Sequence, residues 1–202
     1  MKKTRGFLLT AGILLAITFT LSCSGDDGDK DEGGGSCSAD FGEVKIGSQT
    51  WAAENSNCNV EGSKCYDDAP ANCEEYGRLY TWSQAKSACP KGWHLPTKEE
   101  LEVLGNDAKK LKATSFGGTD DYNFSAMPGG HYSSSDGNGS YGFYDGGYGG
   151  FWWSASEGVS SSGDAYGWVL EMYRNSNSTD WDKKLKQSRN GTGMSSVRCL
   201  KN

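Results

Sequence analysis

Two pairs of neighbouring aspartates, Asp67 with Asp68 and Asp120 with Asp121, are the acidic side chains best placed to hold a metal ion. Calcium takes six to eight oxygen ligands, usually carboxylates and carbonyls that several loops bring together. Asp120 and Asp121 are therefore the candidate calcium ligands. Aspartates in loops also cap turns by accepting hydrogen bonds from nearby backbone amides. The sequence leaves both roles open for these residues.

The two histidines, His94 and His131, show no pattern of a catalytic site. His94 lies between a tryptophan and a leucine beside a predicted helix start, which favours a buried, hydrogen-bonded structural role. His131 lies in a glycine-rich stretch without a nucleophile motif or a third group to orient it. Glycoside hydrolysis needs two carboxylates facing each other across a cleft, and no sequence pattern singles out two acidic residues for this role. We therefore predict no catalytic residue and a protein that is not an enzyme.

Aromatic rings separated by glycines are the strongest candidates for binding. Between residues 129 and 150, nine of 22 residues are glycine, which predicts a long loop without regular structure. Rings on such a loop can stack on sugars or on a partner protein, and tyrosine and tryptophan favour interfaces. They can equally cover a core that lacks aliphatic residues. The candidate ligand-binding residues are Tyr132, Tyr141, Tyr144, Tyr148 and Trp153.

Cys23 is the cysteine with the most specific predicted chemistry. It follows three basic residues within positions 1 to 5 and an apolar run of 15 residues, Phe7 to Leu21. That run has the length of a secretory signal core and is shorter than the ~20 residues that a spanning helix needs. A small residue before the cysteine resembles the bacterial lipobox, in which the thiol is acylated and becomes the new N-terminus. We therefore predict a lipoprotein signal peptide over residues 1–22 and lipid attachment at Cys23; the alternative is an ordinary signal peptide with an incidental cysteine.

Residues 23–36 are predicted to form an acidic, glycine-rich tether. After Cys23 this stretch holds five acidic residues and no apolar residue, so it cannot bury enough surface to offset the entropy of ordering. Acidic tracts in this place also resemble surface-export signals of some Bacteroidota-type lipoproteins; a plain solvated spacer is the alternative. Without residues 1–22 the chain has 17 basic and 26 acidic residues, a net charge of −9. An acidic chain without a basic stripe repels phosphate backbones, so we expect no nucleic-acid partner.

Residues 37–202 are long enough for one domain with its own hydrophobic core. They contain six cysteines, an even number that indicates three disulfides in an exported protein. Zinc is the rival interpretation, but the chain has no Cys-x-x-Cys pair and few histidines. The six cysteines are Cys37, Cys58, Cys65, Cys73, Cys89 and Cys199.

Short elements must position these groups. The domain is rich in glycine and aromatic residues, which fits small strands, long loops and few helices better than an α/β enzyme. Residues 55–73 are predicted to be a loop. Of Trp152 and Trp153, which begin a strand, we expect one to be buried and one exposed. The predicted strands cover residues 43–46, 49–51, 151–154, 165–173 and 196–200, and the predicted helices cover residues 80–88 and 97–104.

Eight separated motifs in the chain carry a resemblance to a known family. With them the chain resembles the Fibrobacter succinogenes major paralogous domain, a family of exported bacterial domains, over essentially all of residues 40 to 201. The motifs, in order, are Ile46–Trp51 (IGSQTW), Cys65–Asp68 (CYDD), Cys73–Trp82 (CEEYGRLYTW), Cys89–Pro96 (CPKGWHLP), Gly117–Asp121 (GGTDD), Phe124–Gly130 (FSAMPGG), Phe151–Ser154 (FWWS) and Ser196–Cys199 (SVRC).

The resemblance extends to the C-type lectin-like fold and its formylglycine-generating-enzyme relatives. It implies an α+β domain with two short helices, small antiparallel sheets and long loops, stapled by disulfides. In C-type lectin-like domains a helix ends in a cysteine that pairs with one on the final strand, which here implies the pair Cys89–Cys199. The Glu-Pro-Asn, Gln-Pro-Asp and Trp-Asn-Asp signatures of sugar-binding C-type lectins are absent from this sequence. We therefore expect no metal ion and no cofactor.

The other two disulfides follow less directly. Cys65 and Cys73 lie eight residues apart across a proline-containing loop and are expected to pair locally. Cys37 with Cys58 is then the pair that remains.

These expectations combine into an exported lipoprotein that Cys23 anchors to an outer-membrane leaflet, facing the periplasm or the cell surface. Its predicted function is non-catalytic binding, of carbohydrate or of a cell-surface protein, through the aromatic residues. One alternative is an enzyme that acts on glycans or is related to formylglycine-generating oxidases, whose chemistry needs reduced cysteines holding copper. A structural protein of the envelope is a further alternative.

Overall fold

A computed structural model of the chain describes residues 37, 40–105, 107–134, 140–159, 161, 163, 165–176 and 193–202. All of them belong to one unit, Gly33–Asn202. The predicted signal peptide, the lipid-attachment residue Cys23 and the tether over residues 23–36 lie outside the described residues. Among the residues that are described, no helix is long and apolar enough to cross a membrane.

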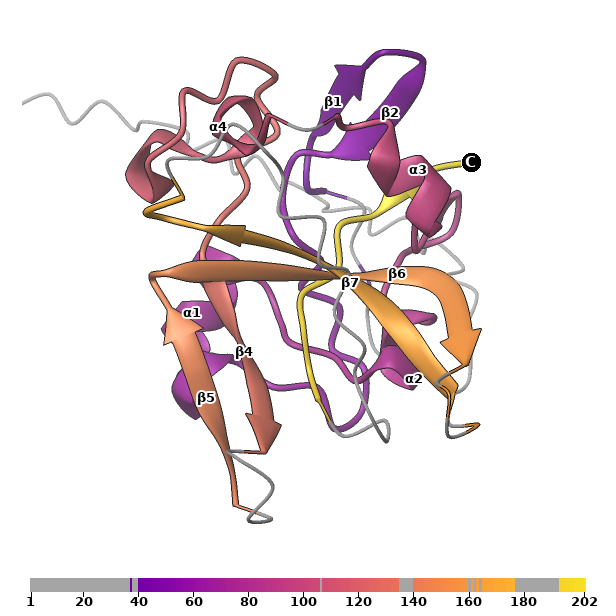
Figure 1. The fold of residues 1–202 in the computed structure, drawn as a ribbon, viewed down its shortest axis with the longest axis vertical. Helices are drawn as coiled ribbons and strands as arrows, with labels where there is room; N and C mark the ends of the chain where they lie inside the picture. Colours follow the sequence, from indigo (N-terminus) through magenta and orange to yellow (C-terminus); the bar gives the residue numbers. More distant parts are fainter. Residues whose placement is uncertain are drawn as a thin grey trace, which may run out of the picture. The chain divides into compact units, whose positions relative to one another are not determined.

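The described domain is α+β, with two four-stranded sheets and short helices (Figure 1). Its strands are β1 (Glu43–Ile46), β2 (Gln49–Ala52), β3 (Trp93–His94), β4 (Gly129–Ser134), β5 (Tyr141–Gly146), β6 (Gly149–Val159), β7 (Ala165–Tyr173) and β8 (Leu200–Lys201). Its helices are α1 (Pro70–Tyr76), α2 (Trp82–Ala85), α3 (Lys98–Glu102) and α4 (Ala108–Leu111), with 3₁₀-helices η1 (Tyr66–Asp68) and η2 (Thr114–Phe116).

The first sheet has the order β1-β2-β8-β3 and is antiparallel throughout. The predicted hairpin of β1 and β2 is confirmed, with its turn at Gly47, which has a positive φ of 61°. The last strand is shorter than predicted, because only β8 pairs as a strand. Residues 194–196 instead form isolated bridges to Tyr132, Tyr80 and Trp152, so the end of the chain joins the two sheets.

The second sheet has the order β5-β4-β6-β7. Strands β4 and β6 pair in parallel, with Gly130 opposite Gly150, while the other two pairs are antiparallel. The expectation of purely antiparallel sheets is therefore wrong at this one junction. Strands β4 and β6 share only this one pair and then diverge: β4 and β5 run toward the bottom of the view, while β6 runs across it to the right (Figure 1).

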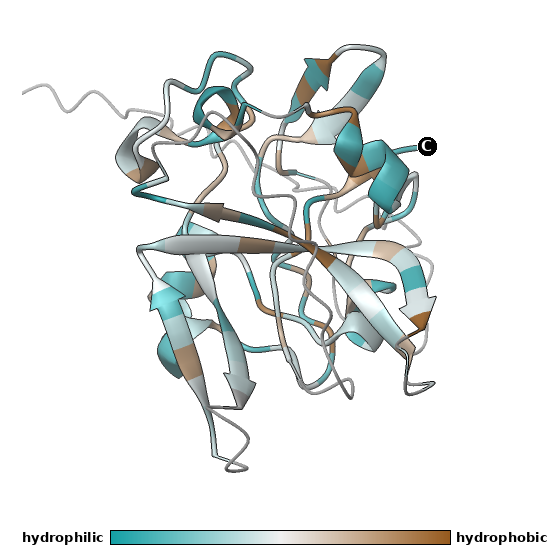
Figure 2. Ribbon diagram, viewed as in Figure 1, coloured by the Kyte–Doolittle hydropathy of each residue, from teal (hydrophilic) through white to brown (hydrophobic). Residues whose placement is uncertain are grey.

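Two hydrophobic clusters pack on opposite faces of β6. The ribbon is brown, the colour of hydrophobic residues, where β6 and β7 cross in the view (Figure 2). Trp152 belongs to one cluster, with residues of α3 and α4, and Trp153 belongs to the other, with Tyr80 and Val169. Both tryptophans are 1 % exposed. The expectation that one of them is exposed is therefore wrong, since a strand covered on both faces buries consecutive residues.

Both predicted helices are present, each shorter than expected. Helices α2 and α3 begin with a complete capping box, made by Thr81 with Gln84 and by Thr97 with Glu100. Helices α1 and α4 were not predicted, so the expectation of two helices is wrong. Helix α1 begins at Pro70, inside the stretch predicted to be a loop. Helices of four to seven residues complete too few turns for apolar periodicity to mark them.

The glycine-rich stretch over residues 129–150 is not the long loop that was predicted. Its described residues form β4, β5 and the start of β6. The prediction fails because these glycines accommodate neighbouring rings: a Cβ at Gly146 would lie 2.3 Å from Cζ of Tyr66, and one at Gly150 would lie 2.3 Å from Cη2 of Trp152. Glycine is needed in these strands because aromatic rings lie against the backbone.

Three disulfides join the six cysteines in the expected pairs, Cys37–Cys58, Cys65–Cys73 and Cys89–Cys199. The last pair ties the segment after α2 to the start of β8 across 110 residues. A loop of that length corresponds to a stabilisation of about 4–5 kcal/mol in the chain-entropy description. This bond fixes the C-terminal segment to the middle of the domain.

Candidate binding surface

A row of four aromatic rings lies along the hairpin β4–β5, and we call it the hairpin face (Tyr66, Tyr132, Tyr141 and Phe143). Tyr132 stacks on Tyr141 at 5.8 Å between ring centroids and 19° between planes. Phe143 lies 4.9 Å from Tyr132 and 5.3 Å from Tyr66, so the four rings touch in sequence. Tyr141 is 45 % exposed, and the other three are half-buried. The row is thus continuous and open to solvent.

The strand register explains why these rings share a face. Tyr132 pairs with Phe143 and Ser134 pairs with Tyr141, so alternation puts Tyr132, Tyr141 and Phe143 on one side of the hairpin. Tyr66 comes from η1 and lies over Gly146, whose backbone N–H donates to the Tyr66 hydroxyl at 3.1 Å. The absence of a side chain at Gly146 therefore lets the fourth ring join the row.

A lysine and an aspartate border the hairpin face. The Lys64 ammonium lies 5.4 Å from the ring centroid of Tyr132 and 5.9 Å from that of Phe143. It also pairs with the carboxylate of Asp68 at 3.0 Å. Both charged groups are partly or wholly exposed. The border therefore offers hydrogen-bond donors and acceptors next to apolar ring faces.

The structure separates the predicted ligand-binding residues into three groups. Only Tyr132 and Tyr141 belong to the hairpin face. Tyr144 packs near His131 at 5.7 Å, on the other side of the hairpin, and Tyr148 packs on the ring of a β7 tyrosine at 5.9 Å. Trp153 is buried, with its indole N–H donated to a backbone carbonyl at 2.6 Å. Trp153 is therefore a core residue and its ring is closed to a ligand.

The two histidines lie in different sheets, His94 in β3 and His131 in β4. His94 forms hydrogen bonds with Asn202 at 2.7 Å and with the Glu100 carboxylate at 3.2 Å. Its side chain is hydrogen-bonded, as expected, but only half-buried. Burial acts to raise the pKa of Glu100, but hydrogen bonds from Thr97 and His94 outweigh it and hold that pKa below its ordinary value. His131 Nδ1 lies 3.6 Å from the carboxylate of Asp145.

The candidate calcium ligands take part in turns. The Asp120 carboxylate accepts hydrogen bonds from the backbone N–H of Ser125 at 2.7 Å and from its hydroxyl at 2.6 Å, with Asp120 itself at a positive φ of 53°. Asp67 and Asp68 also have positive φ values, in η1. The hydrogen bonds of Asp120 are those of the turn-capping role. Within the described ranges, no three His, Cys, Asp or Glu side chains are grouped as metal ligands.

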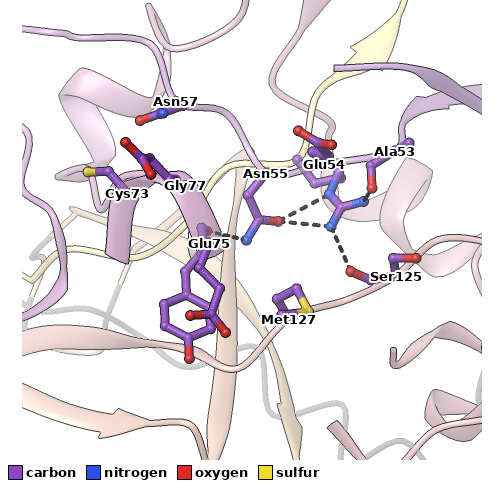
Figure 3. Close-up of a pocket in the computed structure, with 12 residues that line it drawn as sticks. Ala53, Glu54, Asn55, Asn57, Cys73, Glu75, Gly77, Ser125 and Met127 are labelled. Carbon is purple, nitrogen blue, oxygen red and sulfur yellow. Dashed lines mark hydrogen bonds between the residues drawn. The ribbon is translucent and has the colours of Figure 1, made fainter. Parts of the chain in front are cut away.

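A pocket of about 250 Å³ lies between the loop after β2, helix α1 and the segment before β4 (Figure 3). Its mouth carries the exposed carboxylates of Glu54, Glu74 and Glu75, which make the entrance negative. Arg198 also lines the pocket, and its guanidinium donates to Asn55 Oδ1 at 3.0 Å and to the backbone carbonyl of Ser125 at 3.5 Å.

Arg198 is 1 % exposed, and its hydrogen bonds go to neutral acceptors. Its Nε and Nη2 donate to Asn55 Oδ1 at 3.1 and 3.0 Å, and Nη1 donates to the backbone carbonyls of Ala53 and Phe124. Asn55 Oδ1 also accepts from the Trp152 indole at 2.8 Å. Burial lowers the pKa of Arg198 to about 9. The guanidinium therefore ties the segment before β8 to two loops and lines the pocket.

A family model provides the decisive comparison. The Fibrobacter succinogenes major domain matches residues 44–201. The chain belongs to this family. The resemblance seen in the sequence motifs is thereby confirmed, and the family domain includes both the hairpin face and the pocket. No curated protein and no solved structure matches the chain.

Sequence reasoning missed several residues of this family domain. Tyr66 and Lys64 precede α1, far from the hairpin in sequence, and only the fold brings them to β5. Phe143 lies in the glycine-rich stretch over residues 129–150 but is not among the predicted ligand-binding residues. Arg198 and Asn55 carry no sequence pattern beyond the family motif around Arg198. A lone arginine between valine and cysteine in an apolar strand is the signal that could have marked it, because a buried charge needs a constructed set of partners.

Proposed function

We propose that this protein is a non-catalytic carbohydrate-binding lipoprotein and that the hairpin face is its binding surface. The observation that carries the proposal is the row of four touching rings, with Tyr141, opposite Ser134 at one end of the row, 45 % exposed. Rings that lie against a sheet need little further ordering when a ligand binds, which keeps the entropic cost low.

The charged residues that border the hairpin face, Lys64 and Asp68, favour a sugar as the ligand over an apolar surface of a partner protein. A pyranose presents C–H groups on one face, which suit a tyrosine or phenylalanine ring, and hydroxyls at its edge. The Lys64–Asp68 pair supplies donors and acceptors for such hydroxyls beside the rings of Tyr132 and Phe143. Tyrosine hydroxyls add further polar contacts at the same place.

Retention on insoluble polysaccharides tests this proposal with a matched pair of variants. Tyr141→Ala removes a ring of the hairpin face that is 45 % exposed, and Tyr148→Ala removes a ring elsewhere that is 43 % exposed. We expect Tyr141→Ala to weaken binding about tenfold or more, as loss of an interface anchor does, and Tyr148→Ala to bind as wild type. Equal behaviour of the two variants, or no retention of wild type on any polysaccharide of a broad panel, contradicts the proposal.

We also propose that the chain is exported and that lipid attached to Cys23 holds it at an outer-membrane leaflet, facing the periplasm or the cell surface. The support is the sequence of residues 1–23, a basic start and an apolar run that ends in the lipobox-like cysteine. Metabolic labelling with a clickable fatty acid should mark wild type and not Cys23→Ser. Equal labelling of the two, or recovery of unlabelled wild type free of membranes, counts against the anchor.

For the fold we propose a relationship to C-type lectin-like domains. The supporting features are the disulfide between Cys89, just after α2, and Cys199, beside the final strand, and the capped helix α3 that follows. An experimental structure of the chain tests this by superposition on C-type lectin-like domains. Equivalent placement of α2, α3 and this disulfide is the expected result, and a different order of strands around the disulfide contradicts it.

A further inference from the structure

We infer that a second ring surface, on the hairpin β6–β7, binds the same ligand, so that the ligand is a neutral polysaccharide long enough to reach both hairpins. This inference rests on the proposed function of the hairpin face. The second surface, called the β7 face, consists of Tyr166 and Trp168 with the neighbouring side chains of Lys98 and Glu102.

The β7 face is built in the same way as the hairpin face. Tyr166 and Trp168 are two residues apart on one side of β7 and lie 5.1 Å apart in a T-shaped contact, both half-buried. The ring of Tyr166 lies over Gly158 of β6, its partner in register, where a Cβ would come within 2.3 Å of Tyr166 Cζ. In each hairpin a strand glycine thus forms the floor for an aromatic ring, as Gly146 does for Tyr66.

The charges that border the two faces also match. Lys98 Nζ lies 5.8 Å from the Trp168 ring centroid and pairs with Glu102 at 2.6 Å, four residues on. Lys64 has the same relation to Tyr132 and to Asp68. Each face therefore offers one cation and one anion beside its rings. This balance suits a ligand rich in uncharged hydroxyls, and it gives no advantage to a uronate or sulfated chain.

The topology separates the two faces. From the parallel junction at Gly130 and Gly150, Tyr132 lies two residues along β4 and Gly158 lies eight residues along β6. At ~3.3 Å per residue Gly158 lies roughly 25 Å along β6 from this junction, where β6 runs away from β4 (Figure 1). A short oligosaccharide can therefore contact one face only, whereas a polymer can contact both.

Contact with both faces predicts a dependence of affinity on chain length. Once a polymer is held at one face, its contact with the other is intramolecular and proceeds at a high effective concentration. The gain in avidity can reach about 10²–10⁴ without any new kind of contact. The polymer should therefore bind far more tightly than its own di- or trisaccharide.

The test compares a neutral polymer with its trisaccharide, using the detergent-extracted full chain. We expect Trp168→Ala to lower polymer affinity at least tenfold and to change trisaccharide affinity by less than about threefold. Tyr166→Ala serves as a second variant of the same face, and Tyr122→Ala, a ring 38 % exposed outside both faces, serves as the control that binds as wild type. Thermal unfolding of each variant establishes that it is folded.

The outcomes separate the two proposals. If wild type binds no polysaccharide, the proposed function and this inference both fail. If wild type binds polymer and trisaccharide equally well, or if the two β7-face variants match wild type on the polymer, the hairpin face stands and the second site is wrong. Tighter binding of an acidic polymer than of a neutral one also overturns the inference.

Discussion

Strands β5 and the first half of β6 are both rich in glycine and aromatic residues but differ in how deeply their rings are buried. In β6, the run Phe151 to Ser154 is buried on both faces, because β6 is a central strand covered by two hydrophobic clusters. In β5, an edge strand, none of the described side chains is fully buried. The difference lies in what covers each strand, since the residue types are alike. Exposure of a ring therefore follows from sheet position and cannot be read from composition.

The largest contrast between the hairpins should appear in stability. Trp153→Ala empties a site that is 1 % exposed in the core of β6, and we expect it to lower the free energy of unfolding by about 3–5 kcal/mol. Tyr132→Ala, on the half-buried hairpin face, should lower it by less than about 1 kcal/mol. Denaturant titration with the disulfides intact measures both. Similar losses for the two variants would remove the distinction between the buried rings of β6 and the rings of the hairpin face.

A smaller loss of stability is expected when the glycine beneath the Tyr66 ring is replaced by alanine. Gly146→Ala places a methyl group 2.3 Å from Tyr66 Cζ, so the ring must move out of the row. We expect a loss of about 1–3 kcal/mol in stability and weaker polysaccharide binding. Gly142→Ala in the same strand is the matched control, because its nearest neighbour is the terminal hydroxyl of Tyr144 at 3.3 Å. Unchanged binding by Gly146→Ala, measured beside Gly142→Ala, would show that the ring of Tyr66 is dispensable.

The smallest expected effect concerns pH and helix α3, which carries Lys98 of the β7 face. The pKa of Glu100 is lower in the folded domain than its ordinary value of 4.5, so the unfolded chain binds more protons as pH falls through this range. The contribution of Glu100 to stability is therefore complete above about pH 5 and is lost as pH falls through its lowered pKa. Glu100→Gln should flatten this part of the curve of stability against pH. An unchanged slope between pH 3 and pH 5 would contradict the assigned hydrogen bonds.

Much of the architecture could be predicted because local patterns decide it. The β1–β2 hairpin follows from a glycine turn, and α3 follows from the capping spacing of Thr97 and Glu100. The alternation of side chains in residues 165–173 predicts a strand, and β7 covers the same residues. The disulfide Cys89–Cys199 was expected from the resemblance, which carries information that no local pattern holds.

The binding surface was harder to predict, because distant segments build it. Nothing near Tyr66 indicates that it will lie over Gly146, eighty residues further along the chain. Glycine also counts as a breaker of strands in sequence reasoning, whereas here rings from elsewhere make it a requirement of the strand. The burial of Trp153 depends in the same way on its central strand and on the cluster beyond it.

Aromatic-ring NMR of the chain during titration with a neutral polysaccharide fragment tests the central claim most directly. We predict that the ring resonances of Tyr132 and Tyr141 shift in a saturable manner, while those of Tyr148 and Tyr122 stay in place. The reverse pattern, or shifts confined to Tyr76 in the wall of the acidic pocket, would contradict a binding role for the hairpin face.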